Sequence, residues 1–251
     1  MRKETDPDAG WVAALAGVEP ATARRAVERA AAEERLFRHI VREHRAEGRE
    51  GYVEIDAPWE LFALARLLRP RHVVEVGVSS GVSSAYLLAA LERNRRGTLH
   101  SVDRPSRPRS RGRSRNASWS LPPGRESGWA VPDDLRHRWD LRIGDKAEVV
   151  PLLADELPEV GLFVYDVPHD DDNSGLEFSA VDQRMPPGAV AVVDHGPGGG
   201  LCEALQRWAT NRTAEPVHRT GLGLYGFRCG PRPAGPTGQR STATAGRRKA
   251  K

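Results

Sequence analysis

The chain has few cysteines, no long apolar run and no apolar segment close to its first residue. Cys202 and Cys229 are the only cysteines, too few for the disulfide framework of a small secreted protein. Residues 1–6 are mostly charged and offer no signal-peptide core. The apolar runs are far shorter than the ~20 residues that span a bilayer. These absences argue against secreted, disulfide-rich and membrane-embedded classes, and they predict a cytoplasmic protein that does not enter membranes.

Positive charge is not spread over the chain. The 251 residues include 38 basic and 34 acidic side chains, for a formal net charge of +4. Two segments, 104–115 and 229–251, each contain six basic residues and no acidic residue. Elsewhere acidic residues outnumber basic ones, so the folded part is expected to be acidic. A uniformly basic nucleic-acid-binding fold is therefore excluded, and a nucleic-acid partner is not expected.

From residue 72 onward, short apolar strands alternate with helices of about ten residues. The expected strands are 72–76, 98–102, 139–143, 160–165 and 189–193, followed by 216–219 and 223–228. Strands that alternate with helices indicate βαβ units, and right-handed crossovers make the sheet doubly wound. The last two strands are separated only by a glycine-containing turn, which favours an antiparallel hairpin. The predicted fold class is α/β, with a doubly wound, mostly parallel, seven-stranded sheet, an antiparallel edge hairpin and N-terminal helices.

The domain predicted by this pattern occupies residues 57–229, with an Arg-rich insertion at 104–128. Residues 1–56 form an N-terminal helical extension, irregular up to residue 19 and helical over 20–47. This helix could cover a pocket or form a homodimer interface, and the sequence does not decide between them. Residues 230–251 are rich in Pro, Gly, Ser, Thr and basic residues, a composition typical of a disordered basic tail.

A glycine-containing motif links the first strand to the helix that follows. It reads Glu75-Val-Gly77-Val-Ser-Ser-Gly81-Val-Ser83. Glycines allow a sharp turn and a close approach to the backbone, and free N–H groups at a helix start attract anions. The nicotinamide-type pattern G-x-G-x-x-G is absent because Ser79 occupies its middle glycine position. The motif therefore favours a different nucleotide-like cofactor over a dehydrogenase.

Acidic residues and histidines follow three later strands. Asp103 ends the second strand, where a carboxylate can accept hydrogen bonds from ribose hydroxyls. The fourth strand is followed by Asp166 and His169, and the fifth by Asp194 and His195. Carboxylates suit Mg²⁺ and imidazoles suit softer metals such as Zn²⁺. One interpretation is a divalent metal held by Asp166, Asp194 and His195; the other is a set of solvated acids at strand ends.

Taken in order, these motifs resemble those of class I S-adenosylmethionine-dependent methyltransferases. The resemblance is carried by Glu75 to Ser84, Asp103, Gly144-Asp145, Asp166 to His169, and Pro187-Gly188 with Asp194. It is greatest for the bacterial branch related to metal-dependent O-methyltransferases and cephalosporin-hydroxylase-like proteins. It implies a Rossmann-like fold, S-adenosylmethionine as cofactor and a small-molecule methyl acceptor.

The resemblance also implies roles for individual residues. Glu75, Gly77 and Gly81 would shape the pocket for the methionine part of the cofactor, and Ser83 would help at the helix start. Asp103 would hold the ribose, and Asp145 would lie near the adenine. Catalytic roles fall to Asp166 and His169, with Asp166 as base or metal ligand. Asp194 would be a second acidic ligand, and both His169 and Glu177 fit the spacing of that branch.

The expected activity is thus methyl transfer from S-adenosylmethionine to an oxygen nucleophile. The alternative is a catalytically degenerate methyltransferase fold that acts as a binding module, with Arg104 to Arg115 gripping a polyanion. That run carries no interleaved aromatic residue, so base stacking is not indicated.

Overall fold

Seven strands form a single sheet in the computed structural model, which describes residues 8–49, 58–105, 121–167, 174–194, 201–219 and 222–231. The strand order is β3-β2-β1-β4-β5-β7-β6. The strands are β1 His72–Val76, β2 Thr98–Asp103, β3 Trp139–Ile143, β4 Leu162–Tyr165, β5 Val190–Asp194, β6 Pro216–Arg219 and β7 Leu224–Arg228. β1 to β5 pair in parallel, and β7 pairs antiparallel with both β5 and β6. The predicted fold class is therefore confirmed.

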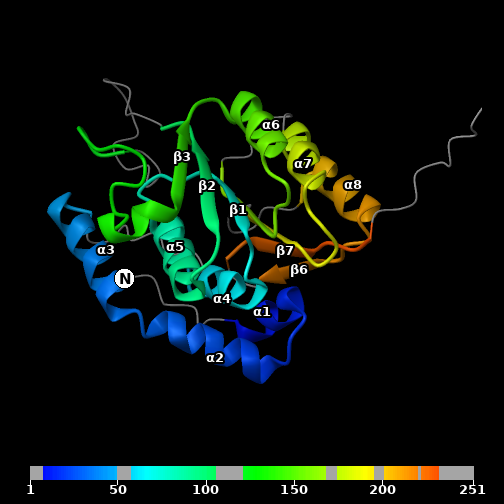
Figure 1. Ribbon diagram of the computed structural model, residues 1–251, viewed down its shortest axis with the longest axis horizontal. Coiled ribbons are helices and arrows are strands. Elements are labelled where there is room, and N and C mark those ends of the chain that lie inside the picture. Colours follow the sequence, from blue (N-terminus) through cyan, green and yellow to red (C-terminus); the bar gives the residue numbers. More distant parts are fainter. Residues whose placement is uncertain are drawn as a thin grey trace, which may run out of the picture.

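Helices cover both faces of the sheet (Figure 1). The helices are α1 Ala9–Ala16, α2 Pro20–Ala31, α3 Glu34–Ala46, α4 Pro58–Leu68, α5 Val82–Asn94, α6 Lys146–Glu156, α7 Ser174–Asp182 and α8 Glu203–Asn211, with a 3₁₀ helix η1 at Asp133–Arg138. One apolar core joins α1, α2, α4 and α5 to the sheet, and a second joins α6, α7 and α8 to its other face. Because both faces are covered, β4 is buried along its whole length. None of the described helices has the length and apolar character needed to cross a membrane.

The N-terminal region contains one more helix and one more break than the sequence predicted. Residues 9–16, expected to be irregular, form α1, because the side chain of Asp8 caps the N–H of Trp11 at 2.9 Å. The expected helix 20–47 is divided into α2 and α3 at Ala32 and Glu33. Glu33 at this junction accepts hydrogen bonds from Arg93 of α5 at 2.8 and 3.0 Å. The break lets α3 take its own direction across the molecule (Figure 1).

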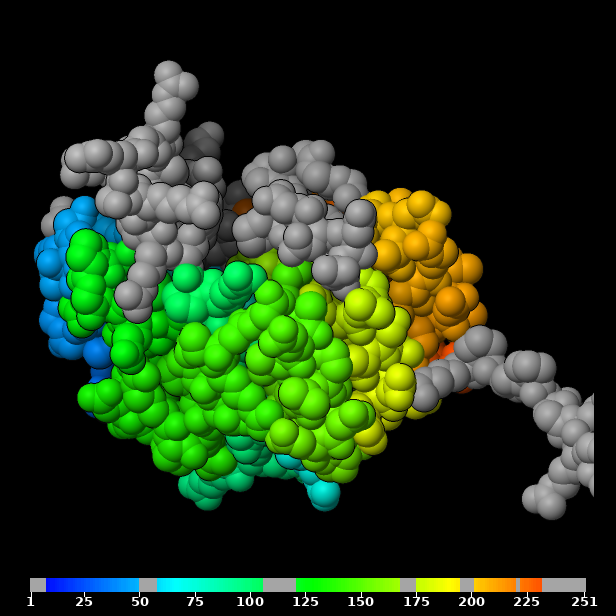
Figure 2. Space-filling model, turned by 90° about the horizontal axis from the view of Figure 1, so that it is seen from above, coloured from blue at the N-terminus to red at the C-terminus, as the bar shows by residue number. Residues whose placement is uncertain are grey.

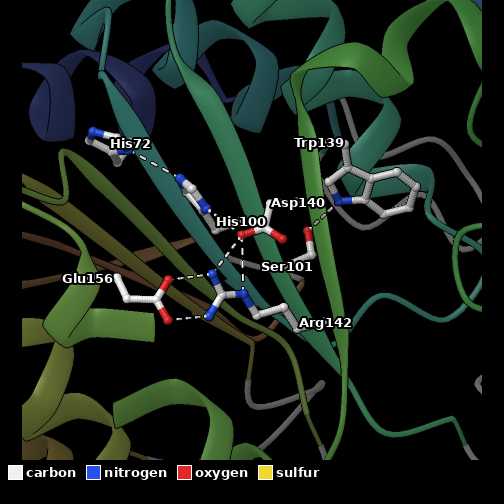
Figure 3. A network of polar contacts seen from close by, with 7 residues as sticks. All are labelled: His72, His100, Ser101, Trp139, Asp140, Arg142 and Glu156. Carbon is white, nitrogen blue, oxygen red and sulfur yellow. Dashed lines mark hydrogen bonds and ion pairs between the residues drawn. The ribbon is translucent and has the colours of Figure 1, made fainter. Parts of the chain in front are cut away.

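Polar side-chain contacts add to the backbone pairing that links the edge strand β3 to its neighbours (Figure 3). His72 Nδ1 lies 3.1 Å from His100 Nε2, and His100 Nδ1 lies 3.1 Å from Asp140 Oδ2. Arg142 bridges Asp140 and Glu156 of α6, with its closest contact to Glu156 at 2.6 Å. Hydrogen bonds and the charges of Glu156 and Asp140 raise the pKa of Arg142 above its ordinary value, despite partial burial. The network therefore joins β1, β2, β3 and α6 in a register set by the sheet.

Candidate active site

The predicted site residues gather at the carboxyl edge of the parallel strands. β1 lies between β2 and β4, so the chain crosses the sheet in opposite directions on the two sides of β1. In doubly wound sheets, ligands bind at such a switch point, outside the carboxyl ends of the strands. Gly77 follows β1, Asp103 ends β2, Asp166 follows β4 and Asp194 ends β5. The tertiary structure thus brings together residues that are up to 117 positions apart in sequence.

The two motif glycines are required for different close approaches. Gly77 has φ +94°, and a Cβ there would lie 1.8 Å from the carbonyl oxygen of Asp166. Gly81 has φ +87°, and its Cβ would lie 2.6 Å from Val131 Cγ2 and 2.8 Å from the Cα of Gly128. At both positions the protein's own chain occupies the space of a side chain. Gly77 therefore lets the end of β4 contact the loop after β1, and Gly81 lets residues 128–131 pack on that loop.

Glu75 is held by hydroxyl groups inside the protein. Its carboxylate is wholly buried and accepts hydrogen bonds from Ser83 Oγ at 2.7 Å, Ser84 Oγ at 2.6 Å and Ser101 Oγ at 2.6 Å. Burial raises the pKa of Glu75, and the three hydroxyl donors reduce this increase. Ser101 also accepts a hydrogen bond from Trp139 Nε1 at 2.8 Å (Figure 3). Glu75 thus links β1, β2, β3 and the start of α5, and it can shape a cofactor pocket only by fixing the loop above it.

The side chain of Asp103 is hydrogen-bonded to the glycine loop that follows β1. Its Oδ1 accepts from the backbone N–H of Val78 at 3.3 Å, and its Oδ2 accepts from the hydroxyl of Ser127. The side chain is half-buried. Each carboxylate oxygen has two lone pairs, so both oxygens can accept a further hydrogen bond.

Asp145 begins α6 and already has two partners. Its Oδ1 caps the N–H of Ala147 at 3.0 Å, and its Oδ2 accepts from Arg104 at 2.6 Å. Of the Arg-rich run 104–115, the structure describes only Arg104 and Pro105. The N-cap geometry explains the Asp at this position without a ligand, so an adenine contact would come from the adjoining backbone or add to these bonds.

Asp166 and Asp194 lie at the ends of neighbouring strands. Tyr165 and Val193 are register partners, so the two acids that follow them are adjacent across the sheet. Asp166 is exposed and Asp194 is half-buried. His169 and His195 lie outside the described residues. Within the described ranges, no group of three or more His, Cys, Asp or Glu side chains is arranged to hold a metal ion.

A buried polar cluster that the strand pattern did not predict adjoins Asp145 and Asp166. Lys146 Nζ lies 2.9 Å from Tyr165 Oη and 3.4 Å from Glu177 Oε2, and the Tyr165 hydroxyl donates to the same Glu177 oxygen. Burial lowers the pKa of Lys146, but its contacts with Tyr165 and Glu177 outweigh burial and raise that pKa. The other oxygen of Glu177 has no hydrogen-bond partner in the described part of the chain. The sequence signal was weak: a tyrosine in an apolar strand and a lysine after an N-cap are each ordinary.

Comparisons with known proteins bear on the fold and on the class of protein. Residues 74–195 match the family described as a methyltransferase domain, whereas no curated protein matches the chain. A putative O-methyltransferase from Klebsiella pneumoniae is 14% identical, with a TM-score of 0.53 over 78% of this chain and 90% of that chain. The O-methyltransferase TomG from Streptomyces achromogenes, solved with S-adenosylmethionine, is 19% identical with a TM-score of 0.52 over 78% and 89%. An O-methyltransferase from Bacillus cereus, solved with S-adenosylhomocysteine, is 13% identical with a TM-score of 0.50 over 76% and 90%.

The sheet order and the carboxyl-edge site define a Rossmann-like nucleotide-binding fold. The match over residues 74–195 identifies this part of the chain as a methyltransferase domain. The resemblance inferred from the motifs is therefore confirmed at the level of a methyltransferase, and the similar structures solved with S-adenosylmethionine or S-adenosylhomocysteine support the predicted cofactor. The family match does not favour a non-catalytic binding module.

Proposed function

We propose that this methyltransferase transfers the methyl group of S-adenosylmethionine to an oxygen atom of a small-molecule acceptor, and that Asp166 acts on that oxygen. The observation that carries the proposal is the contact between Gly77 and Asp166. Only a glycine fits at position 77, because a Cβ there would lie 1.8 Å from the carbonyl oxygen of Asp166. The backbone of Asp166, at the end of β4, is thereby placed directly beside the loop on which the cofactor is expected. The similar structures described as O-methyltransferases lead us to favour oxygen over nitrogen.

The residues at the carboxyl edge fit this cofactor. α5 begins after Gly81 with no side-chain cap on its first N–H groups, and such N–H groups suit the carboxylate of the methionine part. Asp103 retains lone pairs for the two ribose hydroxyls. Gly77 and Gly81 shape the loop, Glu75 and Ser83 hold it from below, and Asp145 belongs to the end of the site assigned to adenine.

Bound S-adenosylmethionine supplies a methyl group on a positively charged sulfur. Asp166 would orient the acceptor hydroxyl and take its proton as the new carbon–oxygen bond forms and the carbon–sulfur electron pair returns to sulfur. His169 is the second candidate base. Most of the acceleration is expected from holding acceptor and methyl group in line, an effect that can contribute about 7–11 kcal/mol.

In this proposal a divalent metal ion would act only on the hydroxyl group of the methyl acceptor. Asp166 and Asp194 are adjacent at the ends of β4 and β5, and carboxylate oxygens suit Mg²⁺ or Mn²⁺. His195 would add a ligand better suited to a softer metal. Such an ion would lower the pKa of a coordinated hydroxyl.

The proposal is tested by separating cofactor binding from turnover. The purified chain is titrated with S-adenosylhomocysteine in a calorimeter, and turnover is followed as transfer of a labelled methyl group to a panel of hydroxylated small molecules, with and without Mg²⁺ or Mn²⁺. Asp103→Ala should weaken binding, because hydrogen bonds to a carboxylate contribute about 1.5–3 kcal/mol each. Asp166→Asn should leave binding intact and lower turnover at least a hundredfold, the lower range of general-base effects.

Asp155→Asn is the matched control, because this carboxylate lies at the far end of α6 and is 79% exposed. It should change neither binding nor turnover. Full turnover of both Asp166→Asn and His169→Ala would refute the assignment of the base. Methylation of amines but no hydroxyls in a mixed panel would refute the choice of oxygen.

A further inference from the structure

The segment 121–131, here called the wall segment, lies against the glycine loop after β1. The backbone N–H of Gly128 donates to the carbonyl of Ser79 at 2.8 Å, and the N–H of Ala130 donates to the carbonyl of Ser80 at 2.9 Å. Gly81 packs against Gly128 and Val131 with no room for a side chain. The wall segment therefore has one defined position over the loop on which the cofactor is expected.

Helix α3 holds the wall segment from outside. Arg125 Nε lies 2.6 Å from Glu47 Oε1, at the carboxyl end of α3, and a second arginine nitrogen lies 3.8 Å from Glu43. The Arg125 guanidinium lies over the Trp129 ring at 5.4 Å, and the ring of His44 lies 4.7 Å from that of Trp129. Figure 2 shows the blue surface of the N-terminal helices beside the green surface that begins at residue 121. The N-terminal extension thus reaches the cofactor edge through this one segment.

Ser127 is the point at which the wall segment meets a proposed cofactor residue. Its hydroxyl donates to Asp103 Oδ2 while the N–H of Val78 donates to Oδ1. Ser127 is only 4% exposed, so water does not readily replace its hydroxyl. One donor on each carboxylate oxygen prevents rotation of the group and leaves the remaining lone pairs in fixed directions.

We propose that Ser127 is a positioning residue that sets the Asp103 carboxylate for the two ribose hydroxyls of the cofactor, and that α3 keeps it there through Arg125. The inference rests on the proposed role of Asp103. Its physical basis is preorganisation: an acceptor that is already oriented does not lose rotational freedom when the ligand binds. The sequence predicted a helix over 20–47 that could cover a pocket or form a homodimer interface. On this proposal its second part, α3, covers the cofactor site.

The first experiment is calorimetric titration of S-adenosylhomocysteine into the full chain and its Ser127 variants. Ser127→Ala should weaken binding about tenfold, the effect of losing one hydrogen bond to a charged group. Ser127→Thr, which keeps the hydroxyl, should restore most of the affinity. A 2′,3′-dideoxy analogue of S-adenosylhomocysteine should bind wild type and Ser127→Ala equally, because it makes no bond to Asp103. A merely structural role for Ser127 would weaken both ligands alike.

The second experiment tests the contact with α3. Glu47→Ala should lower the affinity for S-adenosylhomocysteine severalfold, and its effect should largely vanish in the Ser127→Ala background, because both changes act on one hydrogen bond. Glu156→Ala is the matched control: Glu156 also pairs with an arginine of another element, Arg142 of β3, and it lies on α6 rather than on α3. It should leave the affinity unchanged.

The outcomes separate this inference from the proposed function. If wild type does not bind S-adenosylhomocysteine, or Asp103→Ala binds it as well as wild type, the cofactor site itself is misassigned and the inference fails with it. If binding depends on Asp103 but Ser127→Ala binds normally, only the inference is refuted. Tighter binding by Ser127→Ala would also refute it, because the hydroxyl would then compete with the ribose.

Discussion

Replacing Ser101 with alanine should destabilise the fold more than removing either of the other two hydroxyls that bind Glu75. The Ser101 hydroxyl donates to Glu75 Oε2 at 2.6 Å and accepts from Trp139 Nε1 at 2.8 Å. Ser84 makes one bond to the same carboxylate oxygen, and Ser83 makes one bond to the other. Ser101 and Ser84 are wholly buried, whereas Ser83 is half-buried.

The magnitude follows from the polar groups that each change leaves without a partner. A buried group left unsatisfied costs about 1–3 kcal/mol. Ser101→Ala leaves the half-buried Trp139 indole N–H without this partner and removes one of the two hydrogen bonds to Glu75 Oε2. It should lower the free energy of unfolding by about 2–5 kcal/mol. Ser84→Ala affects only the carboxylate and should cost about 1–3 kcal/mol. Ser83→Ala should cost less than about 1 kcal/mol, because water can reach its position.

The measurement is urea unfolding of the three variants at neutral pH, followed by tryptophan fluorescence and far-ultraviolet circular dichroism. Equal slopes of free energy against urea concentration would show that the variants unfold between comparable states. The expected order of loss is Ser101, Ser84, Ser83. If Ser101→Ala were no more destabilising than Ser83→Ala, the hydrogen-bonded network around Glu75 would not contribute as the geometry indicates.

Three further predictions concern the same edge of the sheet. Burial raises the pKa of Glu75, so the stability that this residue contributes is complete below its ordinary pKa of about 4.5 and is lost as pH rises through the raised pKa. Glu75→Gln should therefore lose less stability than wild type between pH 4 and 7 in urea titrations. Parallel curves of unfolding free energy against pH for the two proteins would contradict this. Gly77→Ala places a Cβ 1.8 Å from the Asp166 carbonyl, so it should abolish S-adenosylhomocysteine binding and lower the melting temperature; a variant with wild-type affinity would show that the loop rearranges freely. Tyr165→Phe removes the hydroxyl that donates to the wholly buried Glu177 and should lower the free energy of unfolding by about 1–3 kcal/mol; a loss below about 0.5 kcal/mol would argue against that bond.

The order of strands and helices in the domain could be predicted because each element carries its own local signal. The segments of β1 and β4 are short, mostly apolar and bounded by turn residues, which is the pattern of strands buried on both faces. The N-terminal helices were harder to predict. The break at Ala32 and Glu33 contains neither Gly nor Pro, and it is stabilised by Arg93, a residue 60 positions away.

The site was predictable where a backbone constraint is written into residue type. Gly77 and Gly81 adopt positive φ angles that favour glycine, and Asp103 ends a strand at the carboxyl edge of the sheet. The roles of Ser127 and Lys146 were not predictable in the same way. Each is an ordinary polar residue in its own segment, and its significance comes from a partner on another element.

The sequence by itself determined the α/β class, the doubly wound sheet, the glycine loop and the acids at the strand ends, because hydrophobic period, turn residues and the succession of strands and helices along the chain are local properties. Only the tertiary structure decided which side chains those features meet. Glu75 proved to be enclosed by three serines, Asp103 to be held by Ser127, and α3 to contact the wall segment through Arg125. Contacts of this kind depend on the packing of segments far apart in the chain, which no local pattern encodes.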